Sequence, residues 1–310
     1  MYFPLEALKI YKSSEYSKVR LGKKRDGGYV ILDGLKYDLL LCCGMGRDIS
    51  FEHALLTQQP KLHCWAYDGT LKKFKQKHKR LVYNKQNIST KNTKDTVNLH
   101  NVLDEHKNIF LKMDIEGGEY DWLHSVTAEQ LSKINQIAIE FHSNIPKFNL
   151  SKFNKYKYEV MEKIAKTHYL VHLHGNNFNE TNLYGDKEII IGPSQNKSKT
   201  IELSKKYPEN TIVDLIKSKP KKYKDFIFNY KIEDNNLTVT RTDADLGWGD
   251  NLKAIICDVK IPDVFECTYV LKSLLPNVTL NIDPIPGPLD HPNSKFVKND
   301  IKLTGYPYTI

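Results

Sequence analysis

A single apolar run that ends in a glycine turn constrains the fold of this chain more than any other feature. Residues 38–44 read Asp-Leu-Leu-Leu-Cys-Cys-Gly. A continuous apolar run of this kind is typical of a strand buried on both faces, as in a parallel sheet covered by helices. Further apolar strands are expected at 62–68, 81–88, 109–114, 134–142 and 168–174. The spacing between them predicts helices at 49–58, 97–106, 120–131 (broken near Thr127) and 153–166. This alternation predicts an α/β fold with helices on both faces of a parallel sheet.

From about residue 187 the pattern changes to short β-type runs separated by turn residues. Residues 264–270 then read as one more buried strand. The segment 187–259 is therefore expected to be a β-rich insertion into a domain formed by residues 1–186 and 260–310.

Charge and composition argue against several classes of protein. The 310 residues include 46 Lys and Arg against 37 Asp and Glu, a net charge of +9. The lysines are spread along the chain, which favours solvated faces over a nucleic-acid interface. No apolar run approaches the ~20 residues of a membrane span, and no signal peptide is expected at the N-terminus. The five cysteines have no C-x-x-C spacing, so a disulfide framework or zinc ribbon is not expected and a cytoplasmic location fits.

Polar residues follow five of the expected strands, at the edge where open α/β sheets bind ligands. They are Gly44-Met45-Gly46, Asp68, Asp114, Glu140 with His142, and His174. A carboxylate such as Asp68, 22 residues after Gly46, suits a hydrogen bond to a ribose diol. Ile49 stands where the dinucleotide fingerprint has its third glycine, which disfavours a pyrophosphate. These features predict an adenosine-containing ligand without a pyrophosphate, for which S-adenosylmethionine is the common candidate.

Residues 114–119, Asp-Ile-Glu-Gly-Gly-Glu, resemble the D-x-E-G-x-E signature of the FkbM-type methyltransferases. Other stretches are similar to the same family, at 25–30, 44–52, 139–142, 172–177, 262–269 and 288–293. The resemblance covers about residues 18–185 and 260–294. It implies a class I methyltransferase fold, which is Rossmann-like with a seven-stranded, mostly parallel sheet and an antiparallel last strand. It also implies S-adenosylmethionine as cofactor and O-methylation of sugars in glycans and natural products.

The resemblance also suggests where the cofactor binds. Asp114 and the glycine turn belong near it, Gly28 near its methionine end, and Asn87 and Ser89 near its adenine. Ser50 is expected to contact the cofactor carboxylate or to form part of the turn. The expected cofactor residues are Gly28, Gly44, Gly46, Ser50, Asp68, Asn87, Ser89 and Asp114.

A sugar hydroxyl is a poor nucleophile, so a base or a metal ion should help to remove its proton. The candidate catalytic groups are His142, His174, Asp114 and Glu116. The histidines are favoured as the base because histidine titrates near neutral pH, and the sequence does not choose between them. The alternative is a Mg²⁺ or Mn²⁺ site formed by Asp114, Glu140 and His142. Glu116 and Glu119 have a structural explanation as acidic residues at a helix start. The expected substrate contacts are Glu116, Glu140, Asn176, Asn177 and Trp248.

The insertion has an expected location in this fold. It falls between His174, which ends the sixth strand, and Val264, which opens the seventh, so it should emerge on the cofactor face. There it would form a lid, a wall or a subunit contact in a homo-oligomer. Trp248 would then stack on a sugar, or else be an ordinary core residue.

These interpretations predict an S-adenosylmethionine-dependent O-methyltransferase that acts on a sugar hydroxyl. The acceptor is expected to be a nucleotide-activated sugar or a glycan unit for bacterial surface polysaccharide (capsule) biosynthesis. One alternative is a nucleic-acid methyltransferase, suggested by the charge. Another is a non-catalytic sugar-binding module on a methyltransferase scaffold. That module would require damage to the cofactor loop, but Gly44, Gly46, Asp68 and Asp114 are all present.

Overall fold

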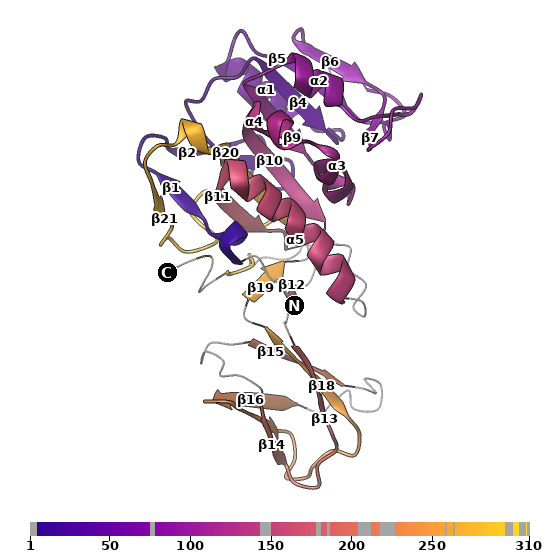
Figure 1. The fold of residues 1–310 in the computed structure, drawn as a ribbon, viewed down its shortest axis with the longest axis vertical. Helices are drawn as coiled ribbons and strands as arrows, with labels where there is room; N and C mark the ends of the chain where they lie inside the picture. The colour runs from indigo at the N-terminus through magenta and orange to yellow at the C-terminus, as the bar shows by residue number, and fades with distance from the viewer. Residues whose placement is uncertain are drawn as a thin grey trace. The chain divides into compact units, whose positions relative to one another are not determined.

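The computed structural model describes residues 5–74, 78–142, 150–177, 181–184, 187–203, 212–217, 227–257, 259–262, 264–294, 300–303 and 308. The chain divides into two compact units (Figure 1). The main unit comprises residues 4–180 and 262–310, and the insertion unit comprises residues 1–3 and 181–261.

A seven-stranded sheet forms the centre of the main unit, in the order β11-β20-β10-β9-β4-β5-β6. All its strands run parallel except β20, which is antiparallel to both of its neighbours, β10 and β11. This confirms the predicted sheet with its antiparallel last strand. The strands are β4 (Leu39–Cys43), β5 (His63–Tyr67), β6 (Leu81–Asn84), β9 (Ile109–Met113), β10 (Ile134–His142), β11 (His168–Gly175) and β20 (Val264–Leu271).

The helices lie close to their expected positions. They are α1 (Ser50–Gln58), α2 (His100–Glu105), α3 (Glu119–Ser125), α4 (Ala128–Ser132) and α5 (Leu150–Thr167). Thr127 separates α3 from α4 as expected, because its side chain caps α4 in a capping box with Gln130. In Figure 1, α5 crosses in front of β10 and β11. Every residue of β4 is buried, as its continuous apolar sequence predicts. Every residue of β9 is buried as well, including Lys112, whose ammonium pairs with the buried Glu52 at 3.2 Å.

Two expected elements differ from the structure. The strand expected over 81–88 ends at Asn84, and the short β7 (Asn87–Ile88) then pairs with β8 (Thr96–Val97). The helix expected from residue 97 begins only at His100. Leu99 has the left-handed φ of 62°, and the Asn98 side chain accepts a hydrogen bond from the His100 amide at 3.1 Å. Both features interrupt regular helix geometry before His100.

Short elements from both ends of the chain pack around the sheet. The strands β2 (Lys18–Leu21) and β3 (Tyr29–Leu32) form an antiparallel pair, and β1 (Tyr11–Ser13) pairs with β21 (Val278–Leu280). The helical turns are η1 (Leu5–Leu8) and η2 (Lys272–Leu274). The Thr268 hydroxyl donates to the Val30 carbonyl at 2.5 Å, and Gln136 exchanges two hydrogen bonds with the Leu32 backbone. These bonds fix the β2–β3 hairpin against β10 and β20.

The insertion unit is made of short antiparallel sheets, β13-β18-β15 and β14-β17-β16, and the pair β12-β19. Its core contains Ile191, Leu237, Val239 and Trp248. The strands are β12 (Thr181–Tyr184), β13 (Lys187–Ile191), β14 (Ser198–Glu202), β15 (Ile212–Lys217), β16 (Phe228–Glu233), β17 (Asn236–Arg241), β18 (Leu252–Cys257) and β19 (Val259–Pro262). None of the helices within the described residues combines the length and the hydrophobicity needed to cross a membrane.

Candidate functional site

A pocket of about 390 Å³ lies at the carboxyl ends of β4, β5 and β9. Five of the expected cofactor residues line it, namely Gly44, Gly46, Asp68, Asn87 and Asp114. The other lining residues are Tyr67, Thr70, Ile88, Ile115 and Glu116. The residues that follow these strands therefore meet in one pocket, although they lie up to 72 positions apart in the sequence, from Gly44 to Glu116.

The turn after β4 requires glycine at two positions for different reasons. Gly44 has φ +74°, and a Cβ there would lie 1.6 Å from the Asp114 carbonyl oxygen. Gly44 therefore allows β4 and the segment after β9 to approach each other closely. Gly46 has φ +63°, but a Cβ there would meet no atom within 4 Å. The backbone at Gly46 thus faces open space in the pocket, where a ligand can approach it.

Asp68 fixes this turn through hydrogen bonds on the side that lines the pocket. One carboxylate oxygen accepts the Gly46 amide at 2.8 Å, and the other accepts the amide and hydroxyl of Thr70 at 2.8 and 2.6 Å. A carboxylate has about four acceptor positions, so the Gly46-bound oxygen retains capacity for a further donor. Beside it, Asn87 accepts the Gly69 amide at 2.9 Å. This arrangement fits a ribose diol whose hydroxyls donate to Asp68.

Three expected cofactor residues do not line the pocket. The hydroxyl and amide of Ser50 both bond to Asp48, each at 3.1 Å, which favours the expected alternative that Ser50 belongs to the turn. The Ser89 amide donates to Val97 at 3.0 Å, and the Gly28 amide donates to Arg25 at 3.1 Å. The backbone groups of Ser89 and Gly28 therefore serve local structure.

His142 stands at the end of β10 among three carboxylates. Its Nδ1 lies 3.0 Å from Glu119 Oε1, while its Nε2 lies 3.5 Å from Glu116 Oε2 and 3.8 Å from Asp114 Oδ1. Glu119 is fully buried and also accepts the Ile115 amide at 3.0 Å. Glu119 therefore fixes the ring and leaves Nε2 facing Asp114, the residue that also lines the cofactor pocket.

The carboxylates control the ionisation of this histidine. Burial alone would lower the pKa of His142, but the hydrogen bond that its ring donates to Glu119 and the charges of Glu119, Glu140 and Asp114 raise it to about 9. Burial raises the pKa of Asp114 to about 6, against the opposing effects of Lys112 and His142. In this structure His142 is therefore an imidazolium at neutral pH, and it must lose that proton before it can accept another.

The grouping of possible metal ligands differs from the expected one. Within the described part of the chain, Asp114, Glu119 and His142 are the group whose ligand atoms all lie within 4.8 Å of one another. Glu140 instead accepts a hydrogen bond from Asn176 Nδ2 at 2.7 Å. Glu119 thus takes the place of Glu140 among the expected metal ligands. The position of Glu119 in the 114–119 motif could have pointed to this role, but an acidic residue at a helix start also has a structural explanation.

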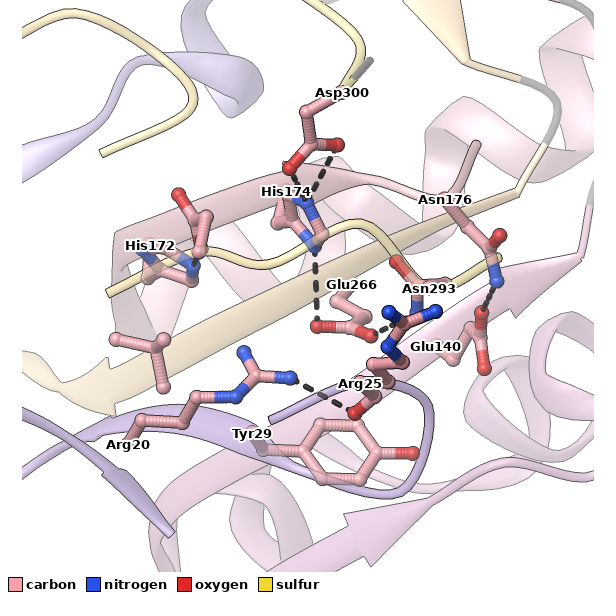
Figure 2. A network of polar contacts seen from close by, with 12 residues as sticks. Arg20, Arg25, Tyr29, Glu140, His172, His174, Asn176, Glu266, Asn293 and Asp300 are labelled. Carbon is pink, nitrogen blue, oxygen red and sulfur yellow. Dashed lines mark hydrogen bonds and ion pairs between the residues drawn. The ribbon is translucent and has the colours of Figure 1, made fainter. Parts of the chain in front are cut away.

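His174 lies in a different environment, shown in Figure 2. Its side chain is fully buried, with Nε2 2.9 Å from both carboxylate oxygens of Asp300 and Nδ1 3.5 Å from Glu266 Oε2. Burial would lower its pKa, but these two carboxylates raise it to about 10. His174 does not line the cofactor pocket. Of the two candidate histidines, His142 is therefore the one that approaches a pocket-lining residue, Asp114, whereas His174 is a buried residue paired with Asp300.

The remaining expected substrate residues form part of the same polar network. Glu140 and Glu266 are directly opposite each other on β10 and β20. Burial, with the charges of Asp114 and Glu266, raises the pKa of Glu140. Glu266 accepts from Asn293 at 2.8 Å, and Asn177 accepts the Ser294 amide at 2.8 Å (Figure 2 shows the first of these bonds). Asn177 thus anchors the C-terminal segment, whereas Glu140 and Asn176 stay close to the Asp114 end of the site.

Trp248 is a core residue of the insertion unit, which was the alternative to a sugar contact. It is 4% exposed, and its ring meets that of Phe228 edge-on at 5.3 Å. Trp248 also lines a hollow of the insertion unit together with Pro193, Ser194, Gln195, Gly247 and Gly249. The sugar contact at Trp248 stays a prediction.

Comparison with protein families gives a match over the middle of the chain. Residues 32–178 match the Methyltransferase FkbM domain family. The match extends from the end of β3 to just beyond β11, so it includes the glycine turn, Asp68, Asp114 and the His142 cluster. No curated protein matches the chain.

Proposed function

Residues 32–178 of this chain are a methyltransferase FkbM domain, and from this premise we propose that the protein methylates a sugar hydroxyl. The domain implies an enzyme that uses S-adenosylmethionine. The observation that carries the proposal is the position of Asp114. It lines the cofactor pocket and its Oδ1 lies 3.8 Å from His142 Nε2, so one residue connects the pocket to a candidate base.

The described residues of the pocket fit the cofactor. The open space at Gly46, the remaining acceptor capacity of Asp68 and the 390 Å³ volume are what a nucleoside with a ribose diol requires. When bound, S-adenosylmethionine supplies a methyl group on a positively charged sulfur. The chain must then hold an acceptor oxygen in line with that methyl group, and such alignment is the main source of rate in a displacement of this kind.

His142 is proposed to take the proton of the acceptor hydroxyl. The Glu119 hydrogen bond at Nδ1 leaves Nε2 as the working nitrogen, in the way that a carboxylate orients a catalytic histidine. Because its pKa is about 9, most of the protein carries His142 in the inactive, protonated form at neutral pH. Glu116 and Glu140 are proposed to bind acceptor hydroxyls near this centre.

A metal-dependent version of the site is a second candidate. Asp114, Glu119 and His142 provide two carboxylates and an imidazole within 4.8 Å, and two of their buried oxygens, Asp114 Oδ1 and Glu119 Oε2, have no hydrogen-bond partner in the described structure. The two carboxylates are ligands that Mg²⁺ or Mn²⁺ prefers, and either ion, held there with neutral His142, would assist removal of the hydroxyl proton. Loss of activity with chelator and recovery with Mg²⁺ or Mn²⁺ would select this version.

The acceptor is proposed to be a nucleotide-activated sugar or a glycan unit for a bacterial surface polysaccharide such as capsule. The surplus of 46 Lys and Arg over 37 Asp and Glu supports an acceptor that carries phosphate. The mass-spectrometric test uses S-adenosylmethionine with a panel of nucleotide sugars. We expect a gain of one methyl group on a member of the panel, and its loss in Asp68→Asn but not in Asp95→Asn, an exposed control outside the pocket.

The rival functions predict different results. Methyl transfer to RNA or DNA in place of the sugars, with nucleic-acid binding that falls steeply as the salt concentration increases, would favour a nucleic-acid methyltransferase. A folded protein that binds sugars but neither binds the cofactor nor transfers a methyl group would favour the non-catalytic module.

A further inference from the structure

The excess of basic over acidic residues in this chain is concentrated in one segment. Residues 69–97, the basic segment, contain nine Lys and Arg and a single acidic residue, Asp95. The rest of the chain contains 37 Lys and Arg against 36 Asp and Glu. Lysines occur along the whole chain, but outside the basic segment acidic residues balance them. Of the net charge of +9, the basic segment therefore carries +8.

The basic segment borders the main sheet at β6, the strand at one end of that sheet. It follows β5 and includes β6, β7 and β8, and in Figure 1 the strands β5, β6 and β7 lie together at one end of the main unit. Three of its residues, Thr70, Asn87 and Ile88, line the cofactor pocket. The positive charge is therefore located at one edge of the sheet and beside this pocket.

Most of the charges in the basic segment have no opposite charge next to them. Within its described residues, the exposed lysines that form no ion pair are Lys72, Lys73, Lys79, Lys85 and Lys91. Lys94 lies 3.9 Å from Asp95, and both side chains are exposed. Charges of one sign that are not neutralised within the protein attract a partner of the opposite sign. The partner expected here is one that presents many negative charges.

The basic segment lacks the features with which proteins read nucleic acids. Its described residues contain no helix that could enter a groove. Its single arginine, Arg80, donates from both terminal nitrogens to backbone carbonyls of residues 56–62. The rings of Phe74 and Tyr83 pack on each other, with centroids 4.7 Å apart and an interplanar angle of 31°, which leaves them poorly placed to stack on bases. These observations disfavour DNA or RNA as the partner.

The same segment fits the surface of an anionic lipid bilayer. A lysine ammonium is a compact point charge that attracts negative headgroups without requiring one particular geometry. Clusters of about 4–8 basic residues bind anionic lipid surfaces in this way. Val82 on β6 is 55% exposed between Arg80 and Lys85, so an apolar side chain is also accessible among the charges.

We propose that the basic segment attaches the protein to the surface of an anionic lipid bilayer, with the lysine ammonium groups against the negative headgroups. The attachment is electrostatic and reversible, and it holds the cofactor pocket close to the bilayer. This proposal goes beyond the proposed function and does not depend on it, because none of the exposed lysines lines the cofactor pocket or belongs to the His142 cluster.

The test is co-sedimentation of the full chain with vesicles of phosphatidylcholine alone and with vesicles that also contain phosphatidylglycerol. We expect no binding to the neutral vesicles. Binding to the anionic vesicles should fall as the salt concentration rises, because salt shortens the range of the attraction. A triple variant with Lys72→Glu, Lys85→Glu and Lys91→Glu should bind about a hundredfold more weakly, since each lysine near the surface contributes about fivefold.

The matched control combines Lys36→Glu, Lys107→Glu and Lys166→Glu, at three exposed lysines outside the basic segment. Both triple variants change the net charge equally, so a difference between them reports where the charge lies. S-adenosylhomocysteine binding should be unchanged in both, which shows that they fold and separates this proposal from the methyl-transfer one. The proposal is overturned if the wild-type protein does not bind anionic vesicles or if the two variants lose binding equally. Tighter binding to duplex DNA or single-stranded RNA than to the anionic vesicles would also overturn it, and would assign the basic segment to nucleic acid.

Discussion

At the scale of single residues, the proposed chemistry depends on the charges of Glu119 and Asp114 around the His142 ring. Glu119 is fully buried and does not itself line the pocket, although it accepts the amide of Ile115, which does. We expect its effect on the reaction to pass through His142, because the charge of Glu119 acts on that ring. It is therefore a positioning residue, and its role should be visible in the pH dependence rather than in cofactor affinity.

The pH profile follows from the raised pKa of His142. A base works only when unprotonated, so turnover should rise with pH as His142 loses its proton, toward the pKa of about 9. Glu119→Gln removes the charge that raises this pKa, so the rise should move to lower pH while the maximal rate falls. Exposed Glu129→Gln is the matched control. An unshifted profile in Glu119→Gln would contradict this role.

Substitution of His142, the proposed base, should lower the rate of methyl transfer without changing the affinity for the cofactor. His142→Gln should lower turnover about 10²–10⁴-fold and leave the dissociation constant of S-adenosylhomocysteine unchanged. His174→Gln should lower turnover far less. Single-turnover methyl transfer measures the first quantity and calorimetry the second. Full activity in His142→Gln would exclude His142 as the base.

At the scale of elements, the two glycines in the turn from β4 to α1 are expected to have different roles, one in folding and one in cofactor binding. Gly44→Ala should prevent stable folding, because a Cβ would lie 1.6 Å from the Asp114 carbonyl oxygen. Gly46→Ala should fold at a cost of about 1–2 kcal/mol for its left-handed backbone. Its Cβ enters the open space of the pocket, so cofactor affinity should fall. Circular dichroism and calorimetry on both variants check this contrast, and a Gly46→Ala protein with unchanged affinity would contradict it.

The sequence predicted the elements well where local patterns determine them. The apolar run of β4 and the Thr127 break between α3 and α4 are local features. The late start of α2 was not predicted, because no local rule indicates a left-handed Leu99. The role of Glu119 was not predicted either, since an acid at a helix start is explained locally and its contact with His142 spans 23 positions.

At the scale of the whole molecule, buried ion pairs attach the C-terminal segment to the sheet. His174 and Asp300 are 126 positions apart, and no sequence pattern pairs them. The family resemblance predicted the sheet topology, but contacts between distant residues depend on how the chain closes. The placement of the insertion unit over the cofactor face stays a prediction.

This ion pair should make stability depend on pH. The pKa of His174 is raised from 6.5 to about 10, so its stabilisation is fully present below pH 6.5 and is lost as pH rises through about 10. The difference in unfolding free energy between wild-type protein and His174→Gln should therefore shrink between these two pH values. Urea unfolding measures it, with exposed His63→Gln as control. A difference that does not change with pH would contradict the pairing.

The most direct test of the central claim is a calorimetric titration of the full chain with S-adenosylhomocysteine. The account predicts saturable binding with one site per chain. It also predicts that Asp68→Asn weakens binding by about 1.5–3 kcal/mol, as expected for a hydrogen bond to a charged group. Absence of binding to a folded protein, or equal affinity in Asp68→Asn, would contradict the assignment of this pocket to the cofactor.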